Sequence, residues 1–438
     1  MTAPLEHNRH DALARLFGGR SGALPRGITS VCSAHALVIE AALRRAAADG
    51  AVALIEATCN QVNQYGGYTG MTPRDFRAFI EKIAGAIGFP TERIIFGGDH
   101  LGPNPWKSLA ADEAMARAET MIAAYAAAGF EKLHLDTSMG CAGEPAALAD
   151  DLTAERAARL AKVAEQAAQD AGHRPPVYII GTEVPPPGGA THALDDIEPT
   201  DADAVKNTYA VHRDAFTDAG IATALDRVVG IVVQPGVEFG NANVAIYKPE
   251  RARALVGALD GLPGLIYEAH STDYQPMEAL AQLVDDGFAI LKVGPGLTFA
   301  LREALYGLDA IAATLDGKDG HGTLFSAMES LMLEKPGHWR SHYTGSDAEQ
   351  RLQRHFSYSD RIRYYWPEKE AATAIDALFA RLEGDIPETL ISQHMARIYP
   401  DVVAGRVAPH ARDLCLAAID AALLPYAHAT GSRTRQAA

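Results

Sequence analysis

The sequence predicts a closed (β/α)8 barrel, an α/β fold, followed by a mostly helical C-terminal extension. Eight short apolar runs recur between residues 28 and 294, and helix-like stretches separate them. Six of these runs follow a stretch that ends at a glycine, which is expected because the chain just past a helix often adopts a left-handed conformation. Strands that alternate with helices pair in parallel, and eight such units close into a barrel. The closing glycines are Gly50, Gly88, Gly129, Gly172, Gly220 and Gly287.

The eight expected strands are short and rich in Val, Ile and Leu, as buried parallel strands usually are. Most of them end at an ionisable or turn-forming residue, where the chain leaves the sheet. In chain order, we expect the strands at Ile28–Cys32, Val52–Ala57, Arg93–Gly98, Lys132–Asp136, Val177–Gly181, Val229–Gln234, Gly264–Glu268 and Ala289–Val293.

The segments around the strands show the apolar periodicity of helices. Residues 8–19 have an amphipathic pattern that predicts a short helix able to plug the bottom of the barrel. In residues 36–49, apolar side chains recur at three- and four-residue steps, which gives one face that can pack on the sheet. The Pro- and Gly-rich run 184–190 excludes helix and central strand. It opens a connection to about residue 200, and long loops at this end of a barrel are usually lids or binding loops.

The length of the chain predicts a second part beyond the barrel. Its 438 residues exceed the roughly 250 residues of a typical barrel. We expect residues 1–310 to form the barrel with its N-terminal helix, and residues 311–438 to form the extension. Apolar periodicity in residues 372–382 and 414–424 predicts helices there. The extension is expected to pack on the barrel or to close over its mouth.

Composition excludes several classes of protein. The net charge of −16 argues against a nucleic-acid partner, although it does not exclude a phosphorylated substrate. No apolar run approaches the roughly 18 residues that span a bilayer, so we expect no membrane partner. Four scattered cysteines without a CxxC pair predict neither a disulfide framework nor a cysteine-type zinc site. The first residues lack the features of a signal peptide, and we therefore expect a cytoplasmic protein.

Two strand ends supply candidate metal ligands at the mouth of the barrel, where chemistry occurs in this fold. The third expected strand is followed by Asp99 and His100, and the seventh by His270. Two imidazoles and one carboxylate make a three-ligand site with open positions for substrate oxygens. Glu183, after the fifth strand, is the preferred third ligand, and Glu238 is the reserve. The alternatives are that Asp99 caps the following turn, that His100 packs under Trp106 and that Glu183 forms a salt bridge within the mouth.

Further polar residues follow other strands. Asp136 is expected to orient a hydroxyl or to carry a proton, although Asp before Thr and Ser is also a common start of a turn. Lys292 and Gly294 belong to a glycine-bearing turn after the eighth strand, where barrels often bind phosphate through backbone N–H groups. Arg361 and Arg363 lie among aromatic residues, and Arg suits phosphate binding. A surface cluster of ion pairs is the alternative for the two arginines.

Six motifs taken together resemble one family, the GatZ/KbaZ group. They are GGDHLGPNPW, HLDTSMG, IGTEVPPPGG, YEAHSTDYQ, LKVGPGLTFALREAL and SDRIRYYW, and the resemblance runs from about residue 8 to 425. Members are named as the non-catalytic subunit of class II tagatose-1,6-bisphosphate aldolase, and some act as D-tagatose 6-phosphate 4-epimerases. The family is similar to the zinc-dependent class II aldolases, which are also (β/α)8 barrels.

The resemblance implies roles for the strand-end residues. Asp99 matches the proton carrier of class II aldolases, whereas His100 and His270 match metal ligands. The further metal-binding His that these aldolases carry after the sixth strand has no match here, because that strand is followed by Gln234-Pro235-Gly236-Val237-Glu238. This departure argues against bisphosphate aldolase activity. It leaves Glu183 as the expected third ligand, with Glu238 or Gln234 as substitutes.

Two functions remain. In the first, the chain inverts C4 of a ketohexose 6-phosphate, converting D-tagatose 6-phosphate to D-fructose 6-phosphate by retro-aldol cleavage and aldol addition. The expected cofactor is a divalent metal, preferably Zn²⁺, with Mg²⁺ or Mn²⁺ as alternatives. In the second, the chain stabilises a separate catalytic aldolase subunit. The buried charges favour the enzyme, because unpaired charges are costly to bury. A homo-oligomer remains open.

The epimerase hypothesis assigns a role to each candidate residue. Asp99 would remove the proton of the C4 hydroxyl, and a second carboxylate would serve the other face of the aldehyde after it has rotated. The candidates for that second carboxylate are Asp136, Glu183 and Asp273. The residues expected to bind substrate are Asn104, Ser138, Lys292, Gly294, Arg361 and Arg363.

Overall fold

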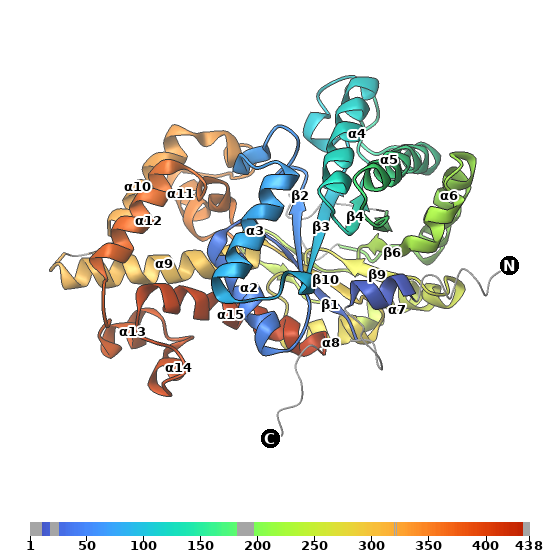
Figure 1. Cartoon of the computed structure of the whole chain (residues 1–438). Coiled ribbons are helices and arrows are strands. Elements are labelled where there is room, and N and C mark those ends of the chain that lie inside the picture. Colours follow the sequence, from blue (N-terminus) through green and yellow to red (C-terminus); the bar gives the residue numbers. More distant parts are fainter. Residues whose placement is uncertain (1–10, 18–25, 182–196, 319, 321, 432–438) are drawn as a thin grey trace.

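The fold is a closed barrel of eight parallel strands (Figure 1). The computed structural model describes residues 11–17, 26–181, 197–318, 320 and 322–431. Around the barrel, the strands follow the order β1-β10-β9-β6-β5-β4-β3-β2, so the predicted fold is confirmed. Their bounds are β1 Ile28–Cys32, β2 Ala53–Thr58, β3 Ile94–Leu101, β4 Lys132–Leu135, β5 Val177–Ile180, β6 Val228–Val233, β9 Ile266–Ala269 and β10 Ile290–Val293. A small hairpin, β7 Glu238–Phe239 and β8 Val244–Ala245, follows β6.

Helices between the strands form the outer layer of the barrel. Glycine ends α3 as predicted: Gly88 has a φ of 70°, and its N–H donates to the carbonyls of Ala84 and Gly85. The helices are α2 Ala36–Ala48, α3 Pro73–Ile87, α4 Ala111–Ala127, α5 Asp150–Asp170, α6 Ala202–Asp218, α7 Pro249–Ala258 and α8 Met277–Asp285. Among the described residues, no helix is long and apolar enough to cross a membrane.

The bottom of the barrel is plugged by the N-terminal helix, as predicted. Within residues 11–17, the side chains of Leu13, Leu16 and Phe17 are buried. They share one apolar cluster with the first residues of several strands, including Ile28 and Ile95. The plug closes the end of the barrel opposite to the C-terminal ends of the strands.

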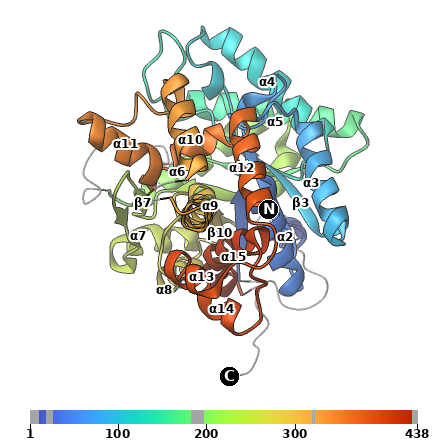
Figure 2. The same ribbon diagram turned by 90° about the vertical axis from the view of Figure 1, so that its left-hand side faces the viewer.

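The last helix of the described chain completes the barrel wall. Helix α9 (Pro295–Leu315) follows β10, but it runs outward, and Figure 2 is viewed nearly along its axis. Helix α15 (Ala411–Ala429) instead packs against α2, α8 and α9. The Tyr426 hydroxyl donates to the carbonyl of Thr272 at 2.6 Å. The predicted division at residue 310 therefore lies inside α9, and the chain returns to the barrel at its end.

The extension lies between α9 and α15 and is mostly helical, as predicted. Its helices are α10 Thr323–Glu334, α11 Asp347–Phe356, α12 Lys369–Arg381, α13 Glu388–His394 and α14 Tyr399–Val403. A 3-10 turn, η8 (Arg361–Tyr365), packs against α9, α10 and α11. This turn brings residues of the extension to the mouth of the barrel.

Candidate active site

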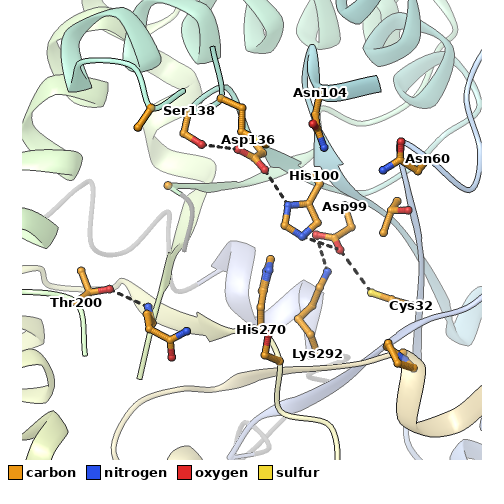
Figure 3. A pocket seen from close by; sticks show the side chains of 18 of the residues that line it. Cys32, Asn60, Asp99, His100, Asn104, Asp136, Ser138, Thr200, His270 and Lys292 are labelled. Carbon is orange, nitrogen blue, oxygen red and sulfur yellow. Dashed lines mark hydrogen bonds and ion pairs between the residues drawn. The ribbon is translucent and has the colours of Figure 1, made fainter. Parts of the chain in front are cut away.

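A cavity of about 890 Å³ lies at the C-terminal ends of the strands (Figure 3). It gathers almost all of the predicted site residues from six separate segments of the chain. Those that line it are Asp99, His100, Asn104, Asp136, Ser138, Gln234, His270, Asp273, Lys292, Gly294, Arg361 and Arg363. Glu183 and the expected lid at 184–190 lie outside the described residues.

Three imidazoles meet at the floor of the cavity. They belong to His100 in β3, His134 in β4 and His270 just after β9, and their ring centroids lie 4.8–5.2 Å apart. His100 has a φ of 48°, a left-handed conformation that is uncommon for a residue with a side chain. Strained backbone of this kind concentrates at functional sites.

Buried carboxylates orient two of these imidazoles. Asp136 Oδ2 lies 2.8 Å from Nδ1 of His100, and the Ser138 hydroxyl donates to Asp136 Oδ1 at 3.0 Å. Glu268 Oε1 lies 2.9 Å from Nε2 of His270. A carboxylate on one ring nitrogen fixes the tautomer and directs the other nitrogen toward a ligand, as is usual for metal-binding histidines. The atoms that would bind metal are thus Nε2 of His100 and Nδ1 of His270.

His134 has a different role from the other two histidines. Its Nε2 lies 2.9 Å from the carbonyl oxygen of Gly181, and its Nδ1 lies 3.0 Å from Asp99 Oδ1 and 3.2 Å from the backbone N of His100. One ligand atom from each of Asp99, His100, His134 and His270 lies within 4.8 Å of the others, close enough to hold a metal ion. Because both ring nitrogens of His134 face protein oxygens, it is better placed to orient Asp99 than to bind metal.

A layer of buried charges lies beneath the imidazoles. The Lys132 ammonium lies 2.7 Å from Glu56 Oε1 and 2.7 Å from Glu268 Oε2, and all three side chains are fully buried. The Lys292 ammonium lies 2.8 Å from Asp99 Oδ1 and also pairs with Glu56. Lys292, which we expected to bind substrate, therefore lines the cavity while it is paired with two carboxylates.

The charges at the floor favour a bound cation. Burial alone would raise the pKa of Asp99, but His100, Lys292 and His134 outweigh burial and hold it well below its usual range. Burial is likewise outweighed at Asp136, where the hydrogen bond and charge of His100 lower the pKa to about 2. Together with Glu56 and Glu268, these residues give four buried carboxylates against the ammonium groups of two lysines. The four carboxylates outnumber the two ammonium groups, so the floor can accept a further cation, and its donor atoms fit a divalent ion.

Asp273 occupies the glycine turn after β10. Its Oδ1 accepts hydrogen bonds from the N–H groups of Gly294 at 2.9 Å and Gly296 at 2.7 Å. Burial raises the pKa of Asp273 to about 6. The two amides that we expected to bind phosphate are thus bonded to a carboxylate of the chain itself.

Gln234 and Glu238, the substitutes for the third metal ligand, accept hydrogen bonds from the backbone of the loop after β6. Gln234 Oε1 accepts from the N–H groups of Gly236 and Val237 at 2.8 and 2.9 Å. Glu238 is fully buried, and its Oε1 accepts from the N–H of Phe239. Neither belongs to the group of described residues that lie close enough to hold an ion.

A sequence model of one family, described as D-tagatose-1,6-bisphosphate aldolase subunit GatZ/KbaZ-like, matches residues 13–431. The chain belongs to this GatZ/KbaZ-like family. A relative from Agrobacterium fabrum, named D-tagatose 6-phosphate 4-epimerase, is 55% identical over 420 residues, which cover 96% of this chain and 98% of that protein. A crystal structure of a probable tagatose 6 phosphate kinase from Sinorhizobium meliloti is 61% identical. The alignment of the two chains covers 92% of this chain and 100% of that chain, with a TM-score of 0.85.

The sequence analysis missed Glu56, Lys132 and Glu268 beneath the imidazoles of this GatZ/KbaZ-like site, and it also missed His134. His134 lies inside β4, between Leu133 and Leu135, where a histidine resembles any other core side chain. A signal was nevertheless present, because Lys132, His134 and Asp136 alternate and so share one face of the strand. Three ionisable residues on one face of a buried strand indicate a polar barrel interior.

Proposed function

We propose that this GatZ/KbaZ-like chain is a D-tagatose 6-phosphate 4-epimerase that depends on a divalent metal. The observation that carries the proposal is the convergence of His100, His270 and Asp99 on the floor of the cavity, with buried carboxylates behind both imidazoles. The name of the relative that is 55% identical supports the choice of substrate and reaction.

The metal would be held by His100 and His270, with Glu183 as the proposed third ligand. Two imidazole nitrogens and a carboxylate oxygen form a ligand set that suits Zn²⁺ and leaves a position open. When bound, the ion would act as a Lewis acid and stabilise negative charge that develops on substrate oxygens.

Asp99 is proposed to take the proton of the C4 hydroxyl. Lys292 and His134 hold its carboxylate in place and help to keep it ionised, so that it can accept a proton. Loss of that proton allows the C3–C4 bond to break, which gives the enediolate of dihydroxyacetone and glyceraldehyde 3-phosphate. The aldehyde then rotates, and C3 adds to its opposite face. The second carboxyl group gives a proton to the new C4 hydroxyl, and the proton held by Asp99 passes to that carboxylate before the next turnover, so the reaction needs no oxidant and no net uptake of water.

Among the described carboxylates, Asp273 is the better candidate to serve the opposite face of the aldehyde. Asp136 is occupied by His100 and Ser138. Asp273 lines the cavity, and its pKa of about 6 lies near neutrality, where an acid–base catalyst works best. We therefore propose Asp99 and Asp273 as the two proton carriers.

The test is an NMR assay of the purified protein alone with D-tagatose 6-phosphate. We expect D-fructose 6-phosphate to form with added Zn²⁺, Mn²⁺ or Mg²⁺, without ATP, and to stop forming after EDTA. Formation of ADP on addition of MgATP would instead indicate a kinase. The family description of an aldolase subunit supports one other candidate, an accessory role. No turnover here, together with a class II aldolase that becomes more stable when this chain is added, would establish that role.

A further inference from the structure

Two guanidinium groups at the wall of the cavity form no ion pair with a carboxylate of the described residues. Arg361 and Arg363 belong to η8 of the extension, and both line the cavity. Arg361 pairs with the carbonyl of His338, whereas Arg363 donates to the carbonyl of Asp360 at 3.1 Å and to the Tyr364 hydroxyl at 2.9 Å. In the part of the chain that the structure describes, neither forms an ion pair with Asp or Glu. Both side chains are half-buried, and Asp360 and Asp273 act on Arg363 from beyond ion-pair distance.

Neighbouring groups respond to this positive charge. Burial raises the pKa of the Tyr364 phenol, but Arg363 and Arg361 outweigh burial and hold it below its ordinary value. Burial lowers the pKa of His342, and Arg361 and Arg363 lower it further. The guanidinium groups lie 5.0 and 4.4 Å from the centre of the Tyr364 ring, so both act on the same side chain. The region around η8 is therefore suited to an anion.

Asp360, which directly precedes η8, holds this turn against α9. This residue is buried and left-handed, with a φ of 45°. Its carboxylate contacts α9: Oδ2 accepts from the Thr298 hydroxyl at 2.6 Å, and Oδ1 lies 3.4 Å from Nε of Arg302. Thr298 and Arg302 belong to α9, so this contact fixes the turn to the barrel.

The glycine turn of the barrel is a poor alternative place for an anion. Asp273 already accepts from the amides of Gly294 and Gly296. An incoming phosphate would have to displace this carboxylate or lie beside it, and like charges repel. The arginines of η8 have no such competitor among the described residues.

We propose that Arg361 and Arg363 bind the 6-phosphate group of the substrate, and that Asp360 is the positioning residue that holds them at the cavity. This inference rests on the proposed function for the identity of the substrate. The extension then supplies the phosphate site, whereas the barrel supplies the reacting groups. A sugar phosphate would lie between η8 and the imidazoles.

The first experiment titrates inorganic phosphate into the full-length protein, followed by calorimetry, both with metal and after EDTA. The variants are Arg361→Met, Arg363→Met and their double, with Arg253→Met on the exposed surface of α7 as the charge-matched control. We expect each single variant to weaken phosphate binding about 10- to 100-fold, as the loss of a charge-assisted hydrogen bond implies, and the control to change nothing. Phosphate that binds the double variant as tightly as Arg253→Met would overturn the proposal.

A second variant distinguishes the two possible places for phosphate. If phosphate displaced Asp273 from the glycine turn, Asp273→Ala would bind inorganic phosphate more tightly. The proposal expects no gain, and a tenfold gain would refute it. Because this titration needs no turnover, it decides the phosphate site even if the epimerase assay fails.

Kinetics test the positioning role of Asp360. Asp360→Asn should raise KM for D-tagatose 6-phosphate several-fold and leave kcat within about twofold, because the arginines shift while the reacting groups stay in place. Far-UV circular dichroism confirms that the variant is folded. A fall in kcat with KM unchanged would exclude this positioning role.

Discussion

The buried charge layer leads to a quantitative prediction about stability. Lys132 is fully buried and neutralises Glu56 and Glu268 at 2.7 Å each. Lys132→Met retains the length and most of the volume of the side chain but leaves Lys292 as the one ammonium group within this layer. Removal of one partner from a buried ion pair costs about 3–5 kcal/mol, because the remaining charge loses its compensation. We expect the free energy of unfolding to fall by that amount.

The assay is urea unfolding in EDTA, followed by far-UV circular dichroism, so that metal binding does not contribute. Lys82→Met, on the exposed surface of α3, should change the free energy by no more than about 0.5 kcal/mol. Glu56→Gln added to Lys132→Met removes one of the two carboxylates that had been paired with Lys132. The double variant should therefore be more stable than the sum of the two single changes by at least about 1 kcal/mol.

Two results would refute the reasoning. A Lys132→Met protein as stable as Lys82→Met would mean that the carboxylates of the layer are protonated or hydrated. Strict additivity in the double variant would mean that Lys132 and Glu56 do not interact. Both comparisons require equal m-values, because a changed m-value reports a changed denatured or native state.

Three further predictions concern the site and the pH dependence of stability. Asp99→Asn should lower kcat about 10²- to 10⁴-fold while the bound metal, measured by mass spectrometry, stays at the level of the unmodified protein. Asp136→Asn removes the negative charge behind His100 and should weaken metal binding about 10- to 100-fold in a chelator competition; unchanged affinity would contradict the role of this carboxylate. Burial lowers the pKa of His355 from 6.5 to about 4, despite the opposing effect of Glu329. The unfolded chain therefore binds the proton at a higher pH than the folded chain does. As the pH falls from 6.5 to 4, this residue should lower the free energy of unfolding by about 3 kcal/mol. In His355→Gln, unfolding free energies measured across that range should depend less on pH, and an identical slope would count against the assignment.

The barrel could be predicted because its signals are local. Each strand is a short apolar run; His270 directly follows β9, whereas Asp99 and His100, expected just past a strand, lie among the last residues of β3 (Ile94–Leu101). Since the C-terminal ends of all strands meet at one mouth, residues far apart in sequence could be assigned to one site. The structure places them around one cavity for this reason.

The rest depends on contacts that no local pattern encodes. His134 acts through Asp99, which belongs to another strand. The amides of Gly294 and Gly296 have the sequence of a phosphate-binding turn, yet Asp273, some twenty residues earlier, occupies them. The pairing of a turn with a distant carboxylate follows from tertiary packing, which the sequence of the turn does not reveal.

The position of α15 has a consequence for how the protein is made. The wall of the barrel between α8 and α2 is filled by a helix that ends at Ala429, and the carbonyl of Thr430 accepts from the N–H of Gly27 at 3.3 Å, just before the first strand. During synthesis, β1 leaves the ribosome long before α15, the helix that covers it. The seam between β1 and β10 thus stays uncovered until α15 has been made. Contacts between residues far apart in sequence form slowly, so a chain that stops before α15 would expose the apolar outer surface of β1 and β10.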